Sequence, residues 1–126
     1  MGATQPLTAA RVVELARSLP QVRLKESVDW SSITFNGKGF AWVNHLKNRA
    51  IIKATHEERE ALLACEPEVF QAGWTSSTTA WVRVNLDLAD PEEVFELLCE
   101  AWRMTATKRA VQAYDASGAG PGGPAT

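Results

Sequence analysis

The stretch Asp90-Pro-Glu-Glu-Val-Phe-Glu-Leu-Leu-Cys-Glu-Ala-Trp-Arg-Met-Thr-Ala-Thr-Lys-Arg109 decides the fold, because it predicts one continuous helix with a marked start, a marked end and one apolar face. Asp90 can cap the first turn, and Pro91 suits the first helical position because no N–H is needed there. Lys108 and Arg109 follow, where the helix dipole favours positive charge. The apolar positions at helical spacing are Val94, Leu97, Leu98, Ala101, Trp102 and Thr105. The sequence therefore predicts a helix whose Trp102 face packs on a core.

The segments before this helix predict two more helices and several short strands. Helices are expected over Thr8–Leu19 and from Thr55, which forms a capping box with Glu58, to about Cys65. Asn36-Gly37 predicts a type I′ hairpin turn. Strands are expected near Leu24–Val28, Ser32–Phe35, Lys38–Val43, Ala50–Lys53 and Ala80–Leu86, with residues 73–79 as a loop. Helices packed on one face of an antiparallel β-sheet make the predicted fold class α+β.

Length and composition predict one domain. The 126 residues are 45% hydrophobic, which suits a single packed core over residues 1–114. The glycine- and proline-rich residues 115–126 are expected to be a disordered tail. No apolar run approaches the ~18 residues of a membrane span and no leader is recognisable, so a cytoplasmic protein without a membrane partner is expected. Cys65 and Cys99 lie among apolar neighbours and are expected to be buried thiols.

Signals for catalysis are weak. His45 and His56 are the only histidines, and neither has a carboxylate or thiol at a spacing typical of a metal site or a triad. Gly37-Lys38-Gly39 is too short for a phosphate loop. The sequence therefore predicts a non-enzymatic protein with no catalytic residues, no metal site and no cofactor.

Charge is unevenly distributed behind a net charge of −2. Between Trp30 and His56 there is no Asp or Glu, and this segment holds the cations Lys38, Lys47, Arg49 and Lys53. The acidic residues gather in 57–68 and 87–100. Such a division gives one basic surface, as nucleic-acid binding requires. The alternative is that these cations only keep strand edges soluble.

Five tryptophans are many for this length, and two of them are candidates for a ligand site. Alternation places Trp81 and Arg83 on the face of the last strand that the helices leave open, and Trp42 is expected on the same face near Lys53. Indoles beside cations can stack bases and hold phosphates, or hold a planar small molecule. Cross-strand aromatic packing without any ligand is the third interpretation. Trp30 and Trp74 lie in segments where the pattern does not decide their role.

Several of these segments, in the same order, resemble the MmcQ/YjbR family. The matching segments are Ser18-Leu19-Pro20, Phe35–Ala41, Glu57–Leu63 with Pro67–Phe70, Ala80–Leu86 and the helix with its Ala-Trp-Arg…Lys-Arg block, which together span about residues 7–109. The first hairpin is a residue shorter than the family pattern, Thr107 stands where proline is common, and Trp30–Thr34 lacks a customary proline.

The resemblance implies a CyaY-like fold and DNA binding through two β-hairpin wings, a "double wing". The first wing maps to Phe35–Phe40 and the second to Asn44–Arg49, so the resemblance and the charge pattern select the same cations. Iron binding as in frataxins is not expected, since the first helix has Glu14 as its only acid. The expected DNA-binding residues are Lys38, Lys47, Arg49, Lys53 and Arg83. The alternative function is small-molecule or protein binding on a sheet face bearing Trp42 and Trp81.

Overall fold

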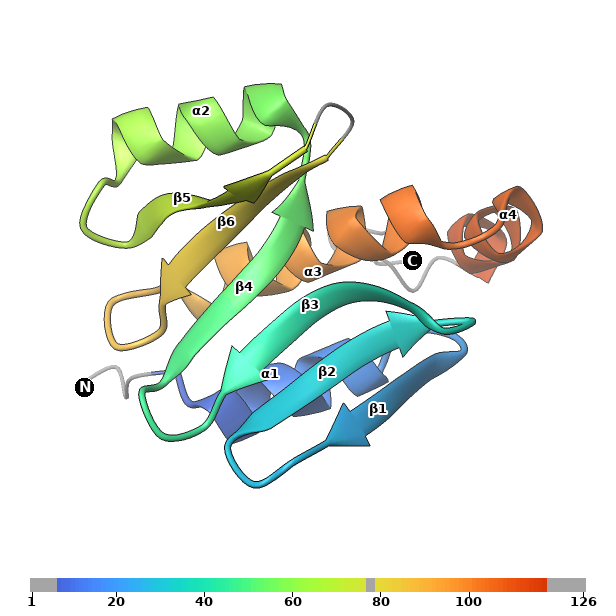
Figure 1. Cartoon of the computed structure of the whole chain (residues 1–126). Helices are drawn as coiled ribbons and strands as arrows, with labels where there is room; N and C mark the ends of the chain where they lie inside the picture. The colour runs from blue at the N-terminus through green and yellow to red at the C-terminus, as the bar shows by residue number, and fades with distance from the viewer. Residues whose placement is uncertain (1–6, 77–78, 118–126) are drawn as a thin grey trace, which may run out of the picture.

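The computed structural model describes residues 7–76 and 79–117, which form a six-stranded antiparallel sheet and four helices (Figure 1). The elements in chain order are α1 (Ala9–Arg17), β1 (Val22–Glu26), β2 (Trp30–Phe35), β3 (Lys38–Asn44), β4 (Arg49–Ala54), α2 (His56–Cys65), β5 (Phe70–Thr75), β6 (Ala80–Asn85), α3 (Pro91–Thr105) and α4 (Lys108–Ser117). The α+β class expected from the sequence is confirmed.

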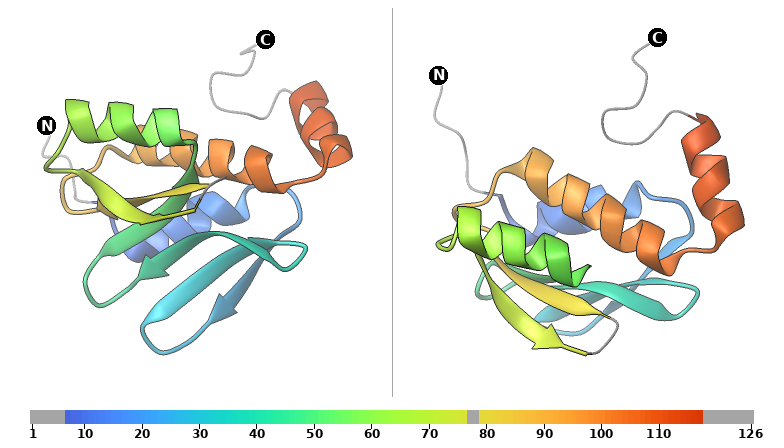
Figure 2. Two further views of the ribbon diagram at one scale, coloured as in Figure 1. Left: turned by 45° about the horizontal axis from the view of Figure 1, so that its top comes forward. Right: turned by 90° about the horizontal axis from the view of Figure 1, so that it is seen from above.

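The sheet order is β1-β2-β3-β4-β6-β5. Tight hairpins join β1 through β4 into a meander, and the turn between β2 and β3 has positive φ at both Asn36 and Gly37, as the sequence predicts. β6 then pairs with β4, and β5 forms the far edge. The helices lie on one side of this sheet, which leaves its other face uncovered (Figure 2).

The core lies between the sheet and the helices. Trp102 on α3 is fully buried, and its indole N–H donates to the carbonyl of Pro20 at 3.0 Å. Its ring meets those of Phe35 and Tyr114 edge to face, with centroids 6.1 and 5.1 Å apart. The predicted core role of Trp102 is therefore confirmed, and its contacts connect α3 with β2, α4 and the segment that follows α1.

The long C-terminal helix predicted from the sequence is two helices. Ala106 is extended, which ends α3, and Thr107 starts α4 by accepting a hydrogen bond from the N–H of Ala110 at 3.2 Å. Lys108 and Arg109 consequently open α4 instead of closing α3. α4 runs to Ser117, three residues past the expected domain boundary, and the rest of the predicted tail lies outside the described residues.

Two further expectations are wrong. Residues 73–75, expected in a loop, belong to strand β5, because a bulge between Ala72 and Thr75 accommodates the glycine without ending the pairing with β6. Cys65 is exposed in the last turn of α2, whereas Cys99 is buried as predicted. Among the described helices, none combines the length and apolarity needed to cross a bilayer.

Candidate functional site

The uncovered face of the sheet, called here the open face, is defined by the strand register. Cross-strand partners point to the same side of a sheet, so one row of partners crosses all six strands. This row is Lys25, Ser32, Trp42, Ile51, Arg83 and Gln71. The neighbouring rows add Arg23 and Thr34 on one side, and Trp30, Asn44, Arg49 and Asn85 on the other.

Among the strand residues that the structure describes, the open face carries cations and no carboxylate. Its positive strand positions are Arg23, Lys25, Arg49, Lys53 and Arg83. The glutamates of α2 and α3 lie on the opposite side, where Glu58, Glu93, Glu96 and Glu100 line a groove between the two helices. A protein with a net charge of −2 therefore presents one basic face.

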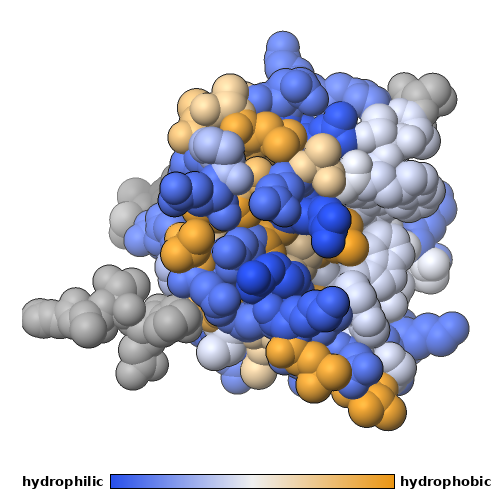
Figure 3. All heavy atoms as spheres, turned by 60° about the vertical axis from the view of Figure 1, so that its left-hand side comes forward, coloured by the Kyte–Doolittle hydropathy of each residue, from blue (hydrophilic) through white to orange (hydrophobic). Residues whose placement is uncertain are grey.

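Three tryptophans form a cluster on the open face. Trp81 lies in the middle, with its ring 4.7 Å from that of Trp42 and 5.7 Å from that of Trp74, onto which it stacks nearly parallel at 7°. These two neighbours leave Trp81 only 5% exposed, while Trp74 is 68% exposed. Figure 3 shows a group of white residues on the right, where part of the open face is visible. White marks intermediate hydropathy, the class that includes tryptophan.

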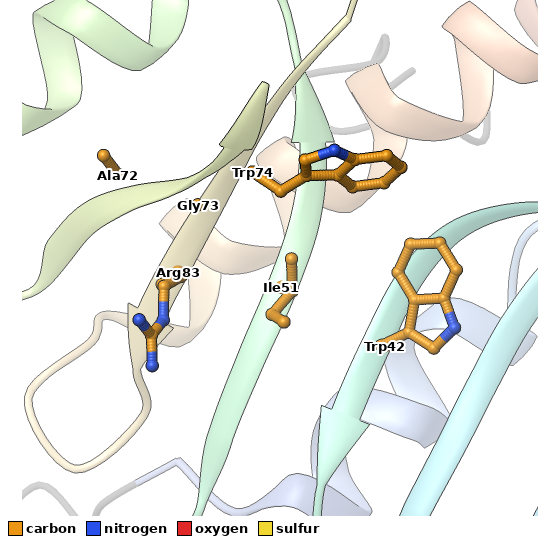
Figure 4. A pocket seen from close by; sticks show the side chains of 6 residues that line it. All are labelled: Trp42, Ile51, Ala72, Gly73, Trp74 and Arg83. Atoms are coloured by element: carbon orange, nitrogen blue, oxygen red, sulfur yellow. The ribbon is translucent and has the colours of Figure 1, made fainter. Parts of the chain in front are cut away.

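A hollow of about 410 Å³ lies between the two outer tryptophans. Figure 4 shows Trp42 and Trp74 on either side of Ile51, with Arg83 on the neighbouring strand. Ala72 and Gly73 complete the lining. Of the six lining residues, Arg83 is charged and the other five are apolar or aromatic. The size lies at the lower end of the range for ligand pockets, about 300–1,000 Å³.

Two glycines make this arrangement possible. A Cβ atom at Gly39 would lie 2.8 Å from Cζ2 of Trp42, so the indole of Trp42 rests directly on the Gly39 backbone. A Cβ atom at Gly73 would lie 2.8 Å from the carbonyl oxygen of Trp81, so the bulged strand β5 can approach β6 only with glycine there.

A second hollow of about 280 Å³ adjoins the first on the open face and shares Ile51 and Arg83 with it. Its lining is polar and basic: Trp30, Asn44, Lys47, Arg49, Gln71 and Asn85 take part, beside Ala50 and Val84. The two hollows thus form an aromatic section and a basic section, with Arg83 between them.

The second predicted wing, Asn44–Arg49, is fixed to the body of the protein. Asn48, at positive φ, accepts from the N–H of Ala9 and donates to the carbonyl of Leu7, both at 2.8 Å, and also donates to Asp87 at 2.9 Å. Arg49 donates to Asp87 at 3.2 Å and to two turn carbonyls. Arg49 is therefore partly neutralised, whereas the Lys47 ammonium makes no hydrogen bond or ion pair within the described residues.

The first predicted wing, Phe35–Phe40, lies at the other end of the sheet. Because β3 runs from Lys38 to Asn44, the two hairpin tips are separated by about 20 Å of strand. Lys53 lies at the same end as Lys38, but its ammonium donates to Thr105 of α3 at 3.1 Å. Burial and the charge of Lys38 lower the pKa of Lys53. The structure thus brings Trp42, Trp81 and Arg83 together, with Arg49 nearby, and keeps Lys38 and Lys47 apart.

Sequence reasoning missed four residues of the open face: Arg23, Lys25, Trp30 and Trp74. The signal for the first two was present, since Val22 and Leu24 alternate with Arg23 and Lys25 in β1. Trp30 begins β2, and Trp74 belongs to the strand that was expected to be a loop. No local pattern places Trp74 against Trp81.

His45 has a partner that its sequence neighbourhood did not reveal. The hydroxyl of Ser31 lies 2.7 Å from Nε2 of His45 and donates to Glu26 at 3.3 Å. In a catalytic triad the histidine lies between serine and carboxylate, whereas here the serine does. Ser31 is fully buried on the core side of β2, so this trio joins β1, β2 and the turn after β3.

Comparison with known proteins agrees with this architecture. The crystal structure of Deinococcus radiodurans protein DR2400, with a DUF419 domain, is similar to this chain with a TM-score of 0.72 and 19% sequence identity, covering 87% of this chain and 89% of that one. At this identity the similarity establishes the fold alone. No curated protein matches the chain. The family model YjbR matches residues 17–104, more than half of the sequence. The chain belongs to the YjbR family.

Proposed function

We propose that this protein is a nucleic-acid-binding module that holds a single strand on its open face. The observation that carries this proposal is the composition of that face: the four cations Arg23, Lys25, Arg49 and Arg83 and the Trp42–Trp81–Trp74 cluster, with no carboxylate among its described strand residues. Proteins that bind single strands without sequence preference combine a basic surface for phosphates with aromatic rings for bases.

The geometry favours a single strand over a duplex. Stacking on Trp74 needs an unpaired base, and Trp74 presents most of its ring to solvent. The six strands span about 24 Å, since neighbouring strands lie about 4.8 Å apart, and this width accommodates several nucleotides. The open face is made of strands and offers no helix that could enter a major groove.

Duplex DNA bound through the two basic hairpins is a second candidate. It is favoured by Lys47, which is exposed in its turn and whose ammonium makes no hydrogen bond or ion pair in the described part of the chain. The separation of the tips by about 20 Å of strand would require Lys38 and Lys47 to contact different stretches of the duplex.

The experiment compares a fluorescently labelled single-stranded oligonucleotide with the same sequence as a duplex, by anisotropy over a range of salt concentrations. We expect the single strand to bind more tightly at ~50 mM salt, with log affinity falling linearly against log salt by about 0.7 for each phosphate contact. The variant Trp74→Ala should weaken single-strand binding, by an amount set by the ~1–3 kcal/mol of stacking per base.

The paired variant Lys47→Glu with Arg49→Glu distinguishes the two candidates. Hairpin binding predicts a large loss of duplex affinity with this pair and little effect of Trp74→Ala. Arg17→Met, which removes an exposed charge from α1 on the helix side, serves as the control. Absence of salt-sensitive binding to either form at ~50 mM salt would refute nucleic-acid binding altogether.

The proposed role is binding without catalysis. In its support, Ser31, whose hydroxyl lies 2.7 Å from Nε2 of His45, is itself fully buried. The planar small molecule expected as an alternative ligand would use the same tryptophans, and it is tested with the mononucleotide below.

A further inference from the structure

We infer that the hollow between Trp42 and Trp74 is a pocket for one nucleotide, which fixes a single base of the bound strand and its phosphate. This inference rests on the proposed function, because it names the position on the open face where the strand is held most specifically. The hollow has the volume of a small ligand site, about 410 Å³, and an aromatic ring on each of two sides.

The aromatic walls suit a planar ring. Trp74 stacks one side of its indole on Trp81 and stays 68% exposed, so it offers a flat surface whose orientation is fixed before binding. Trp42 is held by Trp81 on one side and by the Gly39 backbone beneath. Rings already ordered in the free protein lose little side-chain entropy on binding.

Arg83 supplies the charge that separates a nucleotide from an uncharged planar compound. It lines both hollows, and within the described residues its guanidinium makes no hydrogen bond or ion pair. A base between the tryptophans would place its sugar toward the basic hollow and its phosphate at Arg83. Guanidinium groups bind phosphate oxygens in bidentate fashion, so this contact also orients the nucleotide.

The test is titration of the full chain with thymidine monophosphate, followed by two-dimensional NMR of the five indole N–H signals. We expect the signals of Trp42 and Trp74 to shift in a saturable manner. The signal of Trp102 should stay in place, because its N–H is bonded to Pro20 in the core. Trp74→Ala and Arg83→Met should each weaken binding roughly tenfold, as expected for loss of one stacking or charge-assisted contact. Arg17→Met should leave it unchanged.

The outcomes separate this inference from the proposed function. Salt-dependent oligonucleotide binding without any indole shift from the mononucleotide would refute the nucleotide pocket but leave single-strand binding on the open face supported. Mononucleotide binding without oligonucleotide binding would support the pocket and refute single-strand binding on the open face. Unphosphorylated thymidine binding as tightly as its monophosphate would overturn the role of Arg83.

Discussion

Trp102 on α3 joins strand β2, helix α4 and the segment that follows α1. Its ring is fully buried between Phe35 and Tyr114, and its N–H is satisfied by Pro20. Replacement by alanine removes a large aromatic group and leaves a cavity, so we expect Trp102→Ala to lower the free energy of unfolding by about 3–5 kcal/mol. Urea denaturation measures this loss. An unchanged midpoint would show that the packing around Trp102 is not the core of the fold.

The two glycines under the tryptophan cluster should respond differently to the same substitution. A new Cβ at Gly73 would meet the Trp81 backbone, which cannot move away, so Gly73→Ala should destabilise the protein by about 1–3 kcal/mol. A new Cβ at Gly39 would meet the far end of the Trp42 ring, which can turn away.

Gly39→Ala should therefore cost less stability and instead change the arrangement of the indoles. Thermal unfolding compares the two stabilities, and near-ultraviolet circular dichroism reports the environment of the tryptophans. Equal destabilisation by both substitutions would show that Trp42 is held as firmly as the backbone.

At the scale of elements, a shared proton connects α3 with the end of α2. Burial, a hydrogen bond to Glu66 and the nearby negative charges of Glu66, Asp90 and Glu96 raise the pKa of Glu93 from 4.5 to about 7. A pKa raised on folding means that the native state holds the proton more tightly than the unfolded chain. The resulting stability is fully present below about pH 4.5 and is lost as the pH rises through about 7.

Glu93→Gln keeps the hydrogen-bonding shape without the charge. We expect the variant to melt at a higher temperature than the natural protein at pH 8, with the difference shrinking toward pH 5. Thermal unfolding across this range measures the effect, and Glu92→Gln, an exposed neighbour, is the matched control. A difference independent of pH would contradict the shared proton.

At the scale of the whole molecule, charge is separated between the two sides of the sheet. Arg23 and Lys25 are on the open face at the β1 edge, whereas Lys108 and Arg109 begin α4 on the helix side. Reversing either pair to glutamate changes the net charge equally. If position on the open face matters, only the reversal of Arg23 and Lys25 should weaken single-strand binding.

For Arg23→Glu with Lys25→Glu, we expect the slope of log affinity against log salt to become shallower by about 1.4, the value for two lost single-strand phosphate contacts. Anisotropy at several salt concentrations gives the slope for both paired variants. Equal losses from the two pairs would show that only net charge matters.

The sequence by itself determined the local elements whose signals lie within a few residues. The cap at Asp90 and the stripe through Trp102 predicted α3, and Asn36-Gly37 predicted its hairpin turn. Alternation placed Trp81 and Arg83 on the open face. The α+β class followed, because periodicity and turn chemistry report on the burial of each element.

Only the tertiary structure decided which residues form the candidate site. Residues 73–75 were expected in a loop, but pairing with β6 through a bulge makes them part of strand β5. This pairing brings Trp74 onto Trp81. The hairpins that share basic character lie at opposite ends of β3, a separation that charge counting along the chain cannot show. The physical reason is that cross-strand contacts depend on register and on which strands become neighbours, and these are set by burying the whole apolar face at once.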